Sequence, residues 1–78
     1  MTTVQSAGRS YTVLLIPQEG GYAVEVPALP GCLTQGTNIE QALERAREAI
    51  QGHIEALESE GEPIPEETEP PRLAVVAV

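Results

Sequence analysis

Alternation of apolar and polar residues predicts two neighbouring strands early in the chain. Residues 11–16 are dominated by aliphatic and β-branched side chains, and Pro17 is predicted to end this run. Residues 22–26 alternate cleanly, with tyrosine and valine on one face, which is typical of a half-buried strand. The intervening Gln-Glu-Gly-Gly at 18–21 predicts a hairpin turn, so the two strands are expected to pair antiparallel.

A punctuated loop follows the second strand. Pro27, Pro30 and Gly31 favour turns, because proline fixes φ and glycine admits conformations closed to other residues. Residues 32–35 are then predicted to form a short third strand. The first ten residues are polar and irregular, although residues 2–4 are a candidate extension of the sheet.

The middle of the chain predicts one long amphipathic helix. Thr37 and Asn38 each have a Glu or Gln three residues later, so the capping-box pattern leaves the N-cap open by one residue. Gly61 is placed to follow the helix end, and Pro63 prevents its continuation. Apolar side chains recur at steps of three and four and form one stripe that must pack on the sheet. They are Ile39, Ala42, Leu43, Ala46, Ile50, Ile54 and Leu57.

The last part of the chain predicts a stiff linker and a returning strand. Residues 61–71 contain four prolines and are expected to be extended. Residues 72–78 are almost wholly apolar and are predicted to form the returning strand. The expected fold is a single α+β domain over residues 1–78, in the order β-β-β-α-β. It combines a three-stranded antiparallel meander, one long helix on one face and one returning strand. If the returning strand lies parallel to residues 11–16 through a right-handed crossover, the strand order is 3-2-1-4.

Composition narrows the class of protein. The chain has 78 residues, enough for one domain with a small core, and 41% of them are hydrophobic. A single cysteine excludes an intramolecular disulfide framework and favours a reducing compartment. Neither a leader pattern nor an apolar run of membrane-spanning length is present in the sequence, so we expect a cytoplasmic protein without a membrane partner.

Charge indicates the kind of partner. The formal net charge is -8, and residues 55–69 contain many glutamates and no basic residue. Direct nucleic-acid binding is not expected, because phosphate contacts need Lys and Arg clusters and this chain has only four scattered arginines. Two interpretations stay open: a surface that recognises a basic protein, and a solvated surface that resists aggregation.

The solvent side of the predicted helix is the candidate partner-binding surface. Glu44, Glu48 and Glu55 fall in one narrow sector, and Gly52 lies near it. Like charges at positions i and i+4 and a glycine within a helix both reduce stability. A basic partner that approaches closely over Gly52 explains both features, and drift on a tolerant surface explains them as well.

A second candidate surface is apolar. In residues 13–16 and 73–78 every side chain is apolar, so both faces of these predicted strands are hydrophobic. A single helix covers only one face, and an apolar strip left exposed usually marks an interface. The residues expected at a contact are Leu14 and Ile16 on the first strand and Ala74 and Val76 on the last. We expect a homo-oligomer, dimer or tetramer, or a contact with a partner protein, unless the first ten residues fold over this strip.

Catalysis has little support in the sequence. The chain contains no Asp, so the converging carboxylates of two-metal nuclease chemistry are not expected. His53 is the sole histidine and Cys32 begins a predicted strand, and structural roles are the simpler interpretation of both. We expect no catalytic residue, no metal and no cofactor. An enzyme that uses Glu25 with other carboxylates and a metal remains a third alternative.

The order of these elements, with Pro30-Gly31-Cys32, Thr34-Gln35-Gly36 and the helix start Ile39-Glu40-Gln41-Ala42-Leu43, resembles the HicB family of type II antitoxins. The resemblance covers residues 11–60. It implies a partial ribonuclease H-like fold and a small basic HicA-type partner that cleaves messenger RNA and is inhibited by masking of its catalytic surface. Many family members add a DNA-binding module at the C-terminus, and we expect none after residues 72–78. The alternative is an orphan oligomeric binding or structural module without a toxin.

Overall fold

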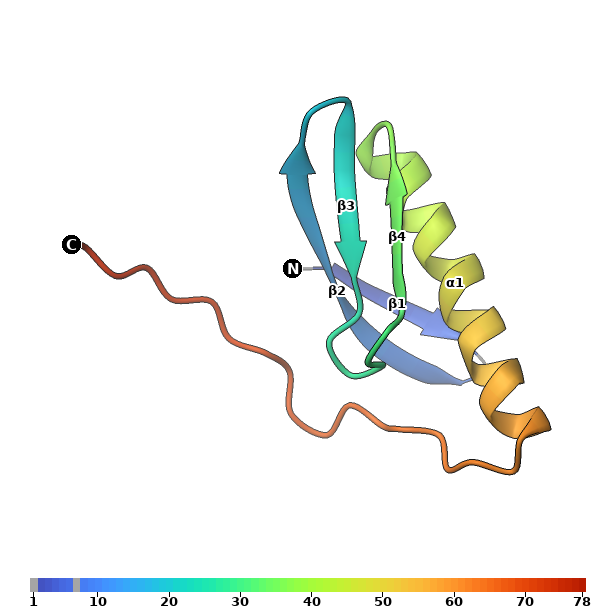
Figure 1. Ribbon diagram of the computed structural model, residues 1–78. Coiled ribbons are helices and arrows are strands. Elements are labelled where there is room, and N and C mark those ends of the chain that lie inside the picture. Colours follow the sequence, from blue (N-terminus) through green and yellow to red (C-terminus); the bar gives the residue numbers. More distant parts are fainter. Residues whose placement is uncertain (1, 7) are drawn as a thin grey trace.

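The computed structural model describes residues 2–6 and 8–78 and shows a four-stranded sheet with one long helix against it (Figure 1). The elements are β1 (Thr2–Ser6), β2 (Arg9–Gln18), β3 (Gly21–Glu25), β4 (Leu33–Gly36) and α1 (Ile39–Ser59). All three strand pairs are antiparallel, and the order in the sheet is β1-β2-β3-β4. The predicted α+β class, with an antiparallel meander and one helix on one face, is confirmed.

The hairpin of β2 and β3 follows the prediction except at Pro17. The strand continues through Pro17, which lies opposite Tyr22, and ends at Gln18. Gln18 and Gly21 form the last pair of the hairpin, on either side of a two-residue loop. The backbone N–H and C=O groups of Gln18, and of every second residue before it, therefore point toward β3. Pro17 therefore faces the other edge of the strand, where its missing N–H removes no bond to β3.

Both ends of α1 are capped by local sequence. The Asn38 side chain accepts a hydrogen bond from Gln41 N at 2.8 Å, which identifies Asn38 as the N-cap, and Gln41 Oε1 accepts one from Thr37 N at 2.8 Å. At the other end Gly61 has φ of 69° and donates to Glu58 O at 3.1 Å. Glu62 N donates to Leu57 O at 2.9 Å, which completes a Schellman motif. The predicted role of Gly61 is confirmed.

The core lies between α1 and one face of the sheet and is mainly aliphatic. The start of the helix packs very closely against β4: a Cβ added at Gly36 would collide with the backbone of Ala42. Glycine is needed at this position for close packing. The buried apolar residues are Val4, Tyr11, Val13, Val24, Val26, Leu29, Cys32, Ala42, Ala46, Ile50 and Ile54.

The segment after α1 is hydrogen-bonded to β2 through one of the segment's backbone carbonyls and one of its carboxylates. Tyr11 Oη donates to Pro65 O at 2.6 Å. Thr12 N donates to Glu67 Oε1 at 2.8 Å, and Thr12 Oγ1 donates to Glu67 Oε2 at 2.7 Å. Ile64 packs against the core. The predicted extended linker is therefore present and returns the chain to the sheet.

The predicted returning strand is wrong in this structure. Residues 72–78, all of them described, form no strand and extend away from the body (Figure 1). β1 lies beside Arg9–Val13 of β2, paired from Ser6 opposite Arg9 to Thr2 opposite Val13, so the order in the sheet is β1-β2-β3-β4 and not 3-2-1-4. A hairpin between sequence neighbours closes at a lower entropic cost than a return from the far end of a helix.

Candidate functional site

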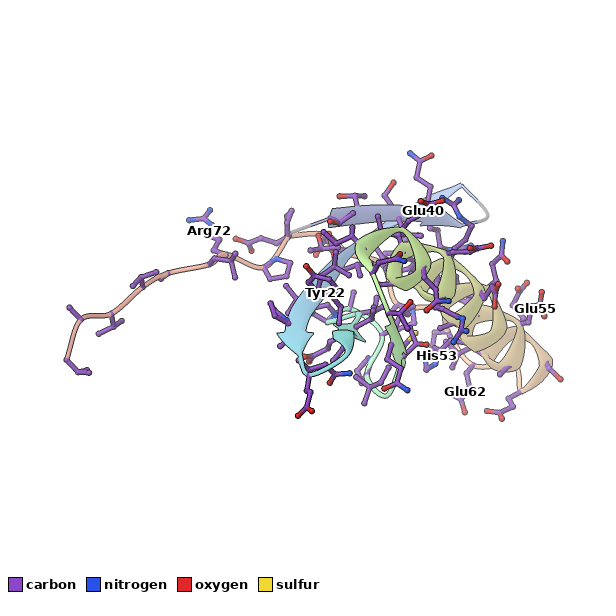
Figure 2. All side chains as sticks on the ribbon, turned by 90° about the horizontal axis from the view of Figure 1, so that it is seen from above. Tyr22, Glu40, His53, Glu55, Glu62 and Arg72 are labelled. Atoms are coloured by element: carbon purple, nitrogen blue, oxygen red, sulfur yellow. The ribbon has the colours of Figure 1, made fainter. Side chains whose placement is uncertain are left out.

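The helix places its predicted partner-binding residues on one exposed surface, here called the acidic face: Glu44, Glu48, Gly52 and Glu55. All four are exposed. At about 100° per residue they fall in a sector roughly 80° wide, on the side of α1 opposite the buried stripe. Figure 2 shows Glu55 pointing away from the sheet. The structure therefore brings together the residues that the sequence selected, while their role in binding stays a prediction.

The charges of α1 are not arranged for helix stability alone. The first turn contains Glu40, which suits the positive end of the helix dipole, but the last turn contains Glu58 and no basic residue. The basic side chains lie toward the flanks: Arg47 Nη1 donates to Gln5 O of β1 at 3.5 Å, and Arg45 borders a polar pocket at the helix start. The acidic face is consequently an uncovered negative surface.

Gly52 has no packing requirement within the described chain. A Cβ built at this position meets nothing within 4 Å, and the residue lies well inside α1. A glycine in a helix interior costs about 1 kcal/mol relative to alanine. Contacts within the free chain do not explain why glycine stands here. The site is open enough for another backbone to approach the helix closely.

Sequence reasoning missed a polar pocket of about 300 Å³ between the β2–β3 turn and the start of α1. Its walls include Glu19 and Arg45, together with the amide side chains of Gln18, Gln35 and Gln41. The three glutamines lie at separate points of the sequence, and only the packing of α1 on β4 brings their side chains to one pocket. No pattern along the sequence predicts that they lie close together.

The residues considered for catalysis have structural surroundings. Cys32 is buried, as predicted, and burial raises the pKa of its thiol above the ordinary value. An activated nucleophile needs the opposite shift. His53 is half-buried on α1. In residues 2–6 and 8–78, no three His, Cys, Asp or Glu side chains come together to hold a metal ion. That the chain is not an enzyme stays a prediction.

The predicted oligomer-contact residues are only partly brought together. Leu14 is half-buried and Ile16 is 45% exposed, both on the sheet face opposite α1. Leu73 borders a small cavity with them, whereas Ala74 and Val76 are exposed and lie beyond it. Throughout the described chain, no helix has the length and apolar character needed to cross a membrane.

Comparison with known proteins identifies the family. Residues 11–74 match the model of the HicB_like antitoxin of bacterial toxin-antitoxin systems. A UPF0150 protein of Thermoplasma acidophilum is 50% identical over 56 residues, which cover 70% of this chain and 81% of that protein. Antitoxin HicB 1 of Photorhabdus laumondii is 45% identical over 56 residues, which cover 70% of this chain and 36% of that protein.

A solved structure agrees with the family match. A chain of the HicA3 and HicB3 toxin-antitoxin complex superposes with a TM-score of 0.66 at 31% identity, and the match covers 80% of this chain and 70% of that chain. The sequence and the fold thus point to the same group of proteins. The chain belongs to the HicB-like antitoxin family.

Proposed function

We propose that this protein binds and neutralises a small basic toxin of the HicA type. The observation that carries the proposal is the likeness, in sequence and fold, to a chain of a solved HicA3–HicB3 complex. In this proposal the toxin is a cytoplasmic ribonuclease that acts on messenger RNA, and the antitoxin inhibits it by masking its catalytic surface. The chain itself needs no catalytic group or cofactor for this task.

The acidic face is the surface that we assign to the toxin. Glu44, Glu48 and Glu55 provide exposed negative charge on a rigid helix, and Gly52 removes the side chain at the same place. A basic partner gains attraction and orientation from such a surface, and screening by salt should weaken the attraction. The Debye length of about 8 Å at physiological salt limits this effect to charges close to the contact.

Titration calorimetry against the product of the adjacent reading frame tests the surface. Glu48→Lys should weaken binding about tenfold or more at low salt, because it places like charge against a basic partner. Glu25→Lys makes the same charge change at an exposed residue of β3, on the face away from α1, and should bind as the parent does. Weakening by the Glu25 variant alone would assign the toxin to the opposite face of the sheet.

The competing function is a small oligomeric module that has lost its toxin. Co-purification separates the two functions. A basic partner encoded beside this chain should elute with it at low salt and release at high salt. If no neighbouring frame encodes such a protein and no HicA-type toxin binds the purified chain, the orphan module is the better account.

A further inference from the structure

Strand β2 has one edge that is only half paired. Toward β1 it is paired from Arg9 to Val13, whereas toward β3 it is paired from Leu14 to Gln18. We call the β1-side edge of residues 14–18 the open edge, because the described residues supply no strand there. By the alternation set at the hairpin, the backbone groups that point to this edge belong to Leu15 and Pro17. The open edge therefore offers the N–H of Leu15 and the carbonyls of both residues.

The same chain carries an extended segment without a partner. Residues 73–78, here called the apolar segment, include Leu73 at 72% exposure, Val75 at 100% and Val76 at 80%. Apolar residues on both faces are typical of a strand covered on both sides. Figure 1 shows the segment reaching away from the sheet. The radius of gyration is 13.2 Å, against roughly 11.5 Å for a compact chain of this length.

The open edge and the apolar segment begin at the same place. Leu73 borders a cavity of about 240 Å³ with Leu14, Leu15 and Ile16 of β2. Pro70 and Pro71 precede it and favour an extended backbone, and the residues after Leu73 then leave the body of the molecule. The segment thus begins beside the open edge of its own chain and leaves it without pairing.

We infer that the occupant of the open edge is the apolar segment of a second copy of this chain. Each copy provides one unpaired edge and one unpaired strand, so a two-fold exchange satisfies both copies and closes the assembly at a dimer. The exchange pairs the free backbone groups of Leu15 and covers Ile16, Val75 and Val76, all of which water reaches in the single chain. The inference does not depend on a toxin, because both surfaces belong to this chain.

Isotope-filtered nuclear Overhauser spectroscopy on mixed labelled and unlabelled protein tests the exchange directly. Contacts between Leu15 or Ile16 of one copy and Val75 or Val76 of the other are expected, together with a sedimentation mass twice 8.3 kDa. Contacts between these residues within one copy, with a mass of 8.3 kDa at high concentration, would overturn the inference in favour of a strand returning to its own sheet.

A double variant tests the segment by a second route. Val75→Asp with Val76→Asp should weaken self-association by at least about 100-fold, because pairing would bury two charges. Ile39→Asp changes a 50%-exposed apolar residue at the start of α1 and should leave the dimer intact. A dimer that persists in the double variant, or association only when the toxin is present, would contradict strand exchange between copies.

Discussion

Replacing Gly52 by alanine separates the stability of the helix from its role in binding. The residue is exposed within α1, and an added Cβ meets nothing within 4 Å. Gly52→Ala should therefore raise the free energy of unfolding by about 0.5–1 kcal/mol, because alanine loses less backbone entropy on folding. For a domain of this size, 1 kcal/mol corresponds to about 4–8 °C, so the melting temperature should rise by roughly 2–8 °C.

Gly36→Ala is the matched control, because it makes the same chemical change where space is lacking. An added Cβ would collide with the backbone of Ala42, so this variant should lose about 1–3 kcal/mol. Thermal melting by circular dichroism measures both variants. In calorimetry with the toxin, the methyl group at Gly52 should weaken binding while it strengthens the fold. A Gly52→Ala protein that melts below the parent would refute the placement of this residue on a free helix surface.

Two further predictions concern the linker and its contacts with β2. Glu67→Gln should lower the free energy of unfolding by about 1–2 kcal/mol, because it removes the negative charge that accepts hydrogen bonds from the backbone N–H and the hydroxyl of Thr12. Glu66→Gln, at the neighbouring exposed residue, should change this free energy little. Equal losses for the two variants in denaturant melts would contradict the contact. Burial raises the pKa of the Tyr11 hydroxyl above its ordinary value of 10.0. The stability that this shift provides is therefore complete below pH 10 and is lost as the pH rises through the higher pKa of the folded state. Tyr11→Phe should reduce this loss of stability at high pH, and an unchanged loss would contradict the assignment to Tyr11.

The sequence predicted the elements whose signal is local. The strand alternation around Val24, the hairpin at residues 18–21 and the cap at Gly61 each depend on a few adjacent residues, and all three are present in the structure. The acidic face follows from helix periodicity alone, so its exposure was also predictable. Gly36 was part of a recognised motif, but its reason is the proximity of Ala42, which only the packed structure reveals.

The sequence predictions failed where the structure depends on contacts between residues far apart in the chain. Residues 72–78 have the composition of a strand, but composition does not specify which edge a strand joins or in which copy. Glu67 and Thr12 are 55 positions apart, and their contact follows no periodic pattern, so it cannot be predicted from the sequence. Pro17 was misjudged for a similar reason, because the role of an edge residue depends on which neighbours pair, whereas the candidate strand at residues 2–4 is present as part of β1.

The most direct test of the proposed function asks whether this chain inhibits the cleavage of RNA by a HicA-type toxin. Purified toxin should lose its activity as this chain is added, with the end point near equal numbers of the two subunits. The Glu48→Lys variant should need a clear excess to reach the same inhibition, and Glu25→Lys should match the parent. Undiminished cleavage in the presence of excess, correctly folded chain would contradict the account.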